Sequence, residues 1–266
     1  MIISFKKVCN FFFYRYKLHG WFGNYATWHE AQKQCTGYNT TSILKKVKKA
    51  ILKVKNGEAA YERDSVTFDT IEYSEPLLNI FKRIAKENKD VLSIVDFGGS
   101  LGSSYFQNKR GLNDVKEIEW SIVEQKHFVD CGKQYIENEE LKFYYTIEEV
   151  LQNTKPQVLL LSSVIQYFEK PYDLIEKCVS YNFDYIIIDR TAFIEGDKGR
   201  ITVQVVPKFI YKASYPAWFL NEQKFVDAFK MKYRLINDFD SKFDPREQLD
   251  GLWAYRKGFF FKKIVK

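Results

Sequence analysis

Four short, almost continuously apolar runs, separated by stretches with helical spacing, are the feature that most constrains the fold. These runs are Val91–Asp96, Glu119–Glu124, Gln157–Leu161 and Tyr185–Asp189. Helical patterns lie between them, around residues 125–138, 146–153 and 171–181. Strands that are apolar on both faces are typical of a parallel sheet covered by helices on both sides. Because strands that alternate with helices form βαβ units, the sequence predicts an α/β fold with a doubly wound, mainly parallel sheet.

The two flanks of this core follow other patterns. Residues 1–60 predict helices and loops, and a further helix is predicted over residues 75–90, where Pro76 suits the first turn. Towards the C-terminus, Arg234–Asp238 and Trp253–Lys263 are strand-like, and we expect them to pair antiparallel at an edge of the sheet. We therefore predict a helical N-terminal extension over residues 1–69, which forms a lid over the pocket, and one main domain over residues 70–266.

A glycine-rich loop follows the first apolar run. Its sequence, from Val95 to Ser104, contains Gly98, Gly99 and Gly102. Gly98 and Gly99 permit a positive φ and the close approach of a ligand, and Gly102 lets the next helix pack tightly. In doubly wound sheets such a loop lies at the carboxyl ends of the strands, where ligands bind. The sequence thus predicts a Rossmann-like fold with a cofactor at this loop.

Two acidic residues favour S-adenosylmethionine over a dinucleotide as that cofactor. Asp96 precedes the first loop glycine by two residues, and its charge would repel a pyrophosphate, whereas it suits a cofactor with an ammonium and a sulfonium. Glu124 ends the second run, where a carboxylate accepts hydrogen bonds from both ribose hydroxyls of an adenosine. An NAD(P)-dependent enzyme and a non-catalytic binding or scaffold protein with a vestigial pocket remain the alternatives.

Further residues are candidates for the same pocket. Tyr144 and Tyr145 precede a helix at the position where the adenine base is expected, and simple core packing is the alternative for both. Ser162 and Ser163 leave the third apolar run and are candidates to contact the methionine part of the cofactor, with helix capping as the alternative.

These residues resemble the class I S-adenosylmethionine-dependent methyltransferases. The resemblance rests on the loop Asp96–Gly102, on Glu124, and on the segments Ser162–Tyr167 and Asp189–Thr191. The flanking motifs Gly20–Tyr25, Tyr61–Asp64 and Tyr215–Phe219 are similar to those of a family of bacterial methyltransferases found in gene clusters for lipopolysaccharide or capsule synthesis. The resemblance covers nearly the whole chain. It implies methyl transfer to a saccharide or a nucleotide-linked sugar in surface polysaccharide biosynthesis.

Methyl transfer to a hydroxyl benefits from a general base and a shaped acceptor site. The candidates for the base are Asp189, which we rank first, His127 and Tyr215. The candidates for the acceptor site are Arg63, Arg190 and Trp218. Each has a structural alternative: an Asp189–Arg190 network, local pairing of Arg63 with its acidic neighbours, and packing of the aromatic cluster.

Charge and composition limit the partners. The net charge is +7, and lysines concentrate on a basic amphipathic helix within residues 43–55, which predicts either a solvated helix face or a peripheral contact with the inner face of a membrane. The Asn/Asp-Pro-Pro-aromatic motif expected for methylation of nucleic-acid bases is missing at residues 162–165, so we expect no nucleic-acid partner. The four cysteines form no CxxC pair and histidines number three, which favours a cytoplasmic location and no metal site. The sequence does not indicate an oligomeric state.

Overall fold

The computed structural model describes residues 19–37 and 40–265. The apolar run Phe11–Tyr14, Cys9 and Tyr38 lie outside the described residues. The helices are α2 (Trp28–Lys33), α3 (Thr40–Lys55), α4 (Glu75–Glu87), α5 (Ser103–Lys109), α6 (Lys126–Tyr135), α7 (Ile147–Asn153), α8 (Pro171–Ser180) and α9 (Glu222–Asp227), with short 3-10 turns η1 (Arg110–Leu112) and η2 (Ile165–Tyr167). The strands are β1 (Gly20–Tyr25), β2 (Tyr61–Arg63), β3 (Val66–Phe68), β4 (Val91–Phe97), β5 (Glu117–Val123), β6 (Leu141–Tyr144), β7 (Val158–Ser162), β8 (Tyr185–Ile194), β9 (Arg200–Val205), β10 (Ser214–Phe219), β11 (Tyr233–Asp240), β12 (Glu247–Leu249) and β13 (Leu252–Lys263).

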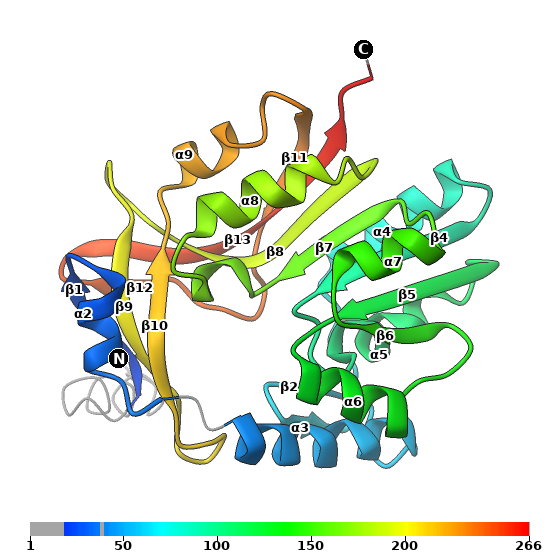
Figure 1. Cartoon of the computed structure of the whole chain (residues 1–266), viewed down its shortest axis with the longest axis horizontal. Coiled ribbons are helices and arrows are strands. Elements are labelled where there is room, and N and C mark those ends of the chain that lie inside the picture. Colours follow the sequence, from blue (N-terminus) through cyan, green and yellow to red (C-terminus); the bar gives the residue numbers. More distant parts are fainter. Residues whose placement is uncertain (1–18, 38–39, 266) are drawn as a thin grey trace, which may run out of the picture.

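The central sheet has eight strands in the order β11-β13-β8-β7-β4-β5-β6, and β12 pairs with β13 (Figure 1). The four apolar runs form β4, β5, β7 and β8, which are mutually parallel together with β6. At the edge, β13 is antiparallel to both β8 and β11. The predicted doubly wound, mainly parallel sheet with antiparallel C-terminal strands is therefore confirmed.

Alternating residues of the strands feed two separate hydrophobic cores, which explains why the strands are apolar throughout. On β7, Val158 and Leu160 face one core, and Leu159 and Leu161 face the other. Helices α3 to α6 cover the first face, and α7 to α9 cover the second. Both faces of the sheet are thus closed, and its strand ends remain the place for a site.

The chain reverses direction across the sheet at β4. From β4 it continues to β5 and β6 on one side, and then returns to β7 and β8 on the other. The carboxyl ends of β4 and β7 are therefore the topological switch point, where doubly wound sheets bind ligands in a crevice.

The N-terminal part contains strands as well as the predicted helices. The strand β1 joins β9 and β10 in a separate antiparallel sheet, and β2 and β3 form a short hairpin. Figure 1 shows the three-stranded sheet beside the central sheet, with α3 running along the bottom of the molecule. Sequence reasoning missed β1, β2 and β3 because they are short and β1 pairs with residues far along the chain, as in Gly20 with Val205. The division at residue 69 and the lid remain predictions.

The basic helix α3 packs its apolar face against the protein itself. Ile43, Val47 and Ile51 are buried in the first core. The Nζ atoms of Lys46 and Lys55 donate hydrogen bonds to the carbonyl oxygens of Ile210 and Tyr135. The apolar face is therefore not available to a bilayer, and the peripheral membrane contact through residues 43–55 stays a prediction, one that would have to use the exposed lysine face.

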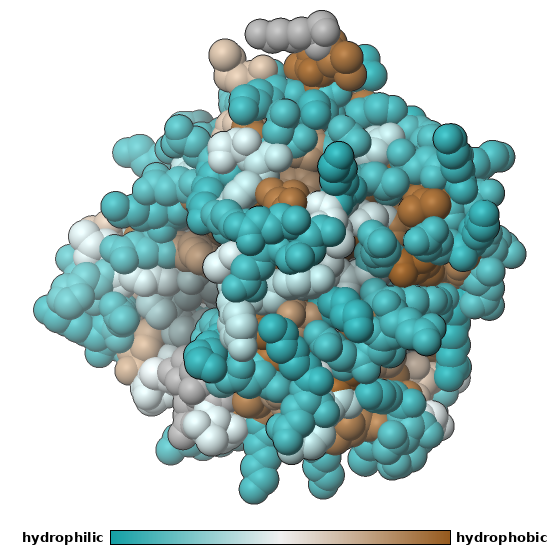
Figure 2. Space-filling model, turned by 45° about the vertical axis from the view of Figure 1, so that its right-hand side comes forward, coloured by the Kyte–Doolittle hydropathy of each residue, from teal (hydrophilic) through white to brown (hydrophobic). Residues whose placement is uncertain are grey.

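Among the described residues, no helix is both long and apolar enough to cross a bilayer. On the face drawn in Figure 2, hydrophilic residues predominate and hydrophobic ones gather in small separate patches.

Gly132 in α6 provides a test of this packing. A Cβ atom added there would lie 2.4 Å from Cδ1 of the Phe143 ring on β6. Alanine favours a helix over glycine by about 1 kcal/mol, but overpacking costs about 1–3 kcal/mol. We expect Gly132→Ala to lower the free energy of unfolding in urea titrations, whereas exposed Gln134→Ala on the same helix leaves it within about 0.5 kcal/mol. A more stable Gly132→Ala variant would contradict the close approach of α6 to the sheet.

Candidate active site

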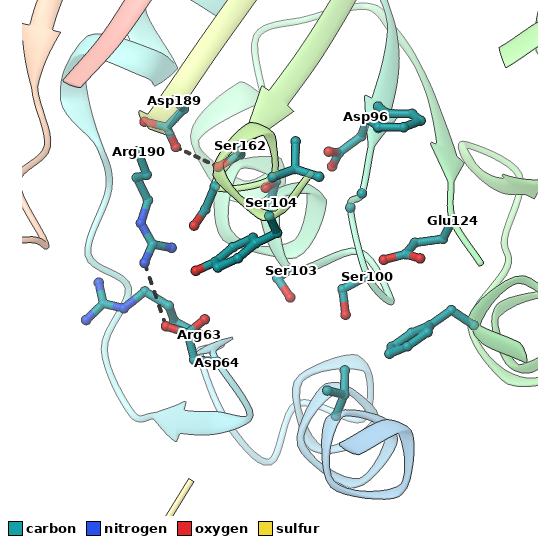
Figure 3. A pocket seen from close by; sticks show the side chains of 18 of the residues that line it. Arg63, Asp64, Asp96, Ser100, Ser103, Ser104, Glu124, Ser162, Asp189 and Arg190 are labelled. Atoms are coloured by element: carbon teal, nitrogen blue, oxygen red, sulfur yellow. Dashed lines mark hydrogen bonds and ion pairs between the residues drawn. The ribbon is translucent and has the colours of Figure 1, made fainter. Parts of the chain in front are cut away.

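A cavity of about 820 Å³ opens at the carboxyl ends of β4, β5, β7 and β8. It lies at the predicted switch point, and the hairpin β2–β3 and helix α3 contribute further walls (Figure 3). Eleven of the residues predicted for the site line this cavity: Arg63, Asp96, Gly98, Gly99, Glu124, Tyr145, Ser162, Ser163, Asp189, Arg190 and Tyr215.

The loop after β4 has room only for glycine at two positions. Gly98 has a φ of +76°, and a Cβ atom there would lie 2.5 Å from Cγ2 of Val164. A Cβ atom on Gly99 would lie 2.6 Å from the carboxyl carbon of Asp96. The backbone of the loop therefore forms an open cradle directly above the Asp96 side chain.

Asp96 is a buried carboxyl group in which one of the two oxygens has no hydrogen-bond partner. Its side chain is 1% exposed, and Oδ2 accepts a hydrogen bond of 3.0 Å from the indole Nε1 of Trp120. Oδ1 is buried and has no hydrogen-bond partner. Burial, together with the nearby carboxylates of Glu124 and Asp189, raises the pKa of Asp96 to about 7, although the hydrogen bond from Trp120 lowers it. A positively charged ligand would reverse this penalty, because an opposite charge favours the ionised form.

Glu124 directly follows β5, at the other side of the loop. Its carboxylate accepts a hydrogen bond of 2.5 Å from the backbone N–H of Gln125, and the backbone of Ser100 donates to it as well. Burial nevertheless raises the pKa of Glu124. Figure 3 shows its carboxylate beside Ser100, facing the space below the loop.

A β-bulge brings two consecutive side chains of β8 to the cavity. Lys257 pairs with Thr191 and Phe259 pairs with Ile188, so that Asp189 and Arg190 together face one residue of β13. In a regular strand neighbouring side chains point to opposite faces, and a bulge re-aims them. Both side chains therefore line the cavity.

Within this bulge, the two side chains have different partners. The Ser162 hydroxyl donates a hydrogen bond of 2.8 Å to Oδ2 of Asp189, and burial raises the pKa of this carboxyl group. The Arg190 guanidinium is paired with Asp244 at 3.0 Å and with Asp64 at 3.7 Å (Figure 3). Arg190 thus ties the N-terminal hairpin to β8, and its predicted contact with an acceptor stays a prediction.

Arg63 and Tyr215 also line the cavity. The Arg63 guanidinium lies over the ring of Phe243, 4.3 Å from the centroid, and its Nη1 has no hydrogen-bond partner. The ring of Tyr215 packs edge-on against Tyr167 at 5.3 Å between centroids.

Four predicted residues lie outside the lining of the cavity. Gly102 precedes α5 with a φ of +98° and packs towards Leu141. The ring of His127 packs against Phe128, and Tyr144 packs into the second core. Trp218 turns away and donates from Nε1 to the carbonyl oxygen of Glu169 at 3.2 Å. These four residues therefore make structural contacts outside the lining of the cavity, and their predicted roles at the site stay predictions.

Sequence reasoning missed Glu62, which is 2% exposed and lines the cavity. It accepts hydrogen bonds from the hydroxyl of Ser103 and from the backbone N–H of Ser65. The sequence suggested a local ion pair with Arg63, but no such pair forms, because the guanidinium lies over Phe243 instead.

Strained backbone concentrates around the cavity. Nine described residues other than glycine have a positive φ, and five of these line the cavity. These five are Asp64, Ser65, Ser100, Ser163 and Arg190. Because a positive φ is unfavourable for such residues, it persists where the surrounding structure enforces it, often at functional sites.

Four carboxyl groups face the cavity without an ion pair to any described basic side chain. They are Glu62, Asp96, Glu124 and Asp189. Among the described residues no group of His, Cys, Asp and Glu could hold a metal ion. The cavity is therefore suited to an elongated organic ligand that carries positive charge.

Comparison with known proteins gives similarity in structure only. No protein-family model matches the chain, and no curated protein is similar to it. The N-terminal domain of EvdMO1 with bound S-adenosylhomocysteine matches 85% of this chain and 98% of its own, with 8% identity and a TM-score of 0.49. An S-adenosylmethionine-dependent methyltransferase from Clostridium acetobutylicum matches 72% of this chain and 92% of its own, with 10% identity and a TM-score of 0.45. At such values the assignment of function has to rest on the residues of the cavity.

The raised pKa of Asp96 predicts a stability that depends on pH. Its pKa is about 7 in the folded protein against an ordinary value of 3.8, so between these values the folded state holds a proton that the unfolded state has lost. Stability therefore falls as pH rises through this window. We expect Asp96→Asn to be more stable than the wild type, with an advantage that grows by about 2 kcal/mol between pH 5 and pH 8.

Urea unfolding at both pH values measures this difference, with exposed Asp114→Asn as the control. An Asp96→Asn advantage that is equal at pH 5 and pH 8 would contradict a protonated, uncompensated Asp96.

Proposed function

We propose that the chain is an S-adenosylmethionine-dependent methyltransferase. The observation that carries the proposal is the set of four unpaired carboxyl groups beside a glycine cradle at the switch point of the sheet. A doubly wound sheet supplies a nucleoside site at this position, and the charge of the cavity selects among the cofactors that fit there.

The two main candidates for the cofactor, S-adenosylmethionine and a nicotinamide dinucleotide, differ in charge. S-adenosylmethionine carries a sulfonium and an ammonium against one carboxylate, so its net charge is positive. A nicotinamide dinucleotide carries an anionic pyrophosphate, which binds where backbone N–H groups and positive charge face it. Asp96 lies directly beneath the loop and would repel that pyrophosphate.

Within this proposal, residues on both sides of the loop hold the cofactor. Glu124 accepts hydrogen bonds from the ribose hydroxyls, and half-exposed Tyr145 lies against the adenine. Asp96 orders the cradle of Gly98 and Gly99, and Ser162 and Ser163 lie at the methionine part.

When bound, S-adenosylmethionine supplies a methyl group on a positively charged sulfur. Asp189 accepts the proton of an acceptor hydroxyl, and the Ser162 hydroxyl holds its carboxylate in place. The raised pKa of Asp189 brings its basicity closer to neutral pH, where a general base is most effective. Tyr215 lies on the same acceptor side.

The acceptor that we propose is a saccharide or a nucleotide-linked sugar of surface polysaccharide biosynthesis. The similarity of the flanking motifs to those of methyltransferases from such gene clusters supports this choice. The aromatic side chains of Trp28, Tyr167 and Tyr215 line the cavity, and they suit the face of a ring-shaped acceptor.

Glu124 gives the first test of this proposal. We expect the wild type to bind S-adenosylhomocysteine in calorimetric titrations, and Glu124→Ala to weaken binding by about 1–3 kcal/mol, since hydrogen bonds to a charged group are lost. Glu119→Ala removes an exposed glutamate of β5, the strand that Glu124 directly follows. Glu119 lies outside the lining of the cavity, so this variant should bind as the wild type does.

Two results would contradict the proposal. Binding of NADH in place of S-adenosylhomocysteine would indicate a nicotinamide-dependent enzyme. A folded wild type that binds neither S-adenosylhomocysteine nor NADH would favour a non-catalytic scaffold with a vestigial pocket.

A further inference from the structure

Glu62 is a carboxyl group of the cavity wall for which the proposed function has no role so far. It lies on β2, in the N-terminal hairpin, and is 2% exposed. Its Oε2 accepts a hydrogen bond of 2.9 Å from the backbone N–H of Ser65, and its Oε1 accepts one from the Ser103 hydroxyl. A carboxylate has about four acceptor positions, so Glu62 keeps capacity for a further donor.

Ser103 places Glu62 next to the cofactor loop. It is the first residue of α5, directly after the loop that ends at Gly102. Figure 3 shows Glu124, Ser100 and Ser103 one after another across the cavity. Glu62, which contacts Ser103, therefore lies towards the end of the loop away from Glu124.

Among the described residues, no lysine, arginine or histidine forms an ion pair with Glu62. The side-chain charge that affects its pKa is the like charge of Asp64, which raises it. Burial raises the pKa of Glu62 to about 7. A buried carboxylate is stable when a cation pairs with it, so a cationic ligand in the cavity would stabilise the ionised form of Glu62.

The cofactor offers one such partner at this end. If Glu124 binds the ribose, the amino-acid part extends along the loop away from Glu124. Its ammonium has three N–H donors, whereas its sulfonium has none. We propose that Glu62 binds the ammonium of the amino-acid part of the cofactor. This inference rests on the proposed function and adds a residue from the N-terminal extension to the cofactor site.

Two nucleosides that differ in the amino-acid part separate this role from a general structural one. S-adenosylhomocysteine carries the ammonium, and 5′-methylthioadenosine is an uncharged nucleoside without it. At pH 8, we expect Glu62→Gln to weaken binding of S-adenosylhomocysteine by about 10-fold or more, the scale of a hydrogen bond between charged groups. Binding of 5′-methylthioadenosine should change by less than 2-fold.

Two controls make the titrations decisive. Glu58→Gln neutralises an exposed glutamate of the same N-terminal part and should bind both nucleosides as the wild type does. Thermal unfolding at pH 8 checks folding, and Glu62→Gln should melt at or above the wild-type temperature, because a buried charge is removed.

The outcomes distinguish this inference from the proposed function. A Glu62→Gln variant that binds S-adenosylhomocysteine as the wild type does, or that loses both nucleosides equally, would overturn the role of Glu62 and leave the methyltransferase proposal intact. A wild type that binds neither nucleoside would overturn the proposed function itself.

Discussion

The buried carboxyl group of Asp96, which has one hydrogen bond from Trp120 and no cation, is the constraint on which the site depends. Position 99 requires glycine, because a side chain there would clash with the carboxyl group of Asp96. Keeping such a group in a folded protein costs stability. This cost is understandable when a ligand with positive charge offsets it. Glu62 and Glu124 also line the cavity without a described basic partner, whereas the charge of Arg190 lowers the pKa of Asp189.

The segments with a strained backbone help to hold the carboxyl groups in position around the cavity. The bulge at Asp189 and Arg190 turns both side chains towards the cavity, and the ion pair of Arg190 with Asp64 holds the N-terminal hairpin against β8. That hairpin carries Glu62 to the cofactor loop. The N-terminal extension is thereby connected to the sheet by polar contacts at the cavity as well as by the packing of α3.

The sequence predicted the parts of the structure that depend on local pattern. The four parallel strands were predictable because burial on both faces requires apolar residues throughout. The turn after the first strand was predictable because Gly98 and Gly99 stand where a side chain would clash. Glu62 escaped prediction because its contact with Ser103 spans 41 residues and follows no spacing rule. The bulge at Asp189 and Arg190 escaped because it depends on the register of β13. The ring of His127 lies beside Phe128 and outside the lining of the cavity, so its role as a base stays a prediction.

We propose that the cavity selects a nucleoside cofactor by the positive charge that this cofactor carries. The most direct measurement is the thermal unfolding of the wild type at pH 8 with saturating S-adenosylmethionine and, separately, with saturating NADH. A ligand at about 100 times its Kd adds about 2.7 kcal/mol, which raises the Tm of a chain of this size by about 5–10 °C. The account predicts such a rise with S-adenosylmethionine and none with NADH. A rise with NADH and none with S-adenosylmethionine would contradict it.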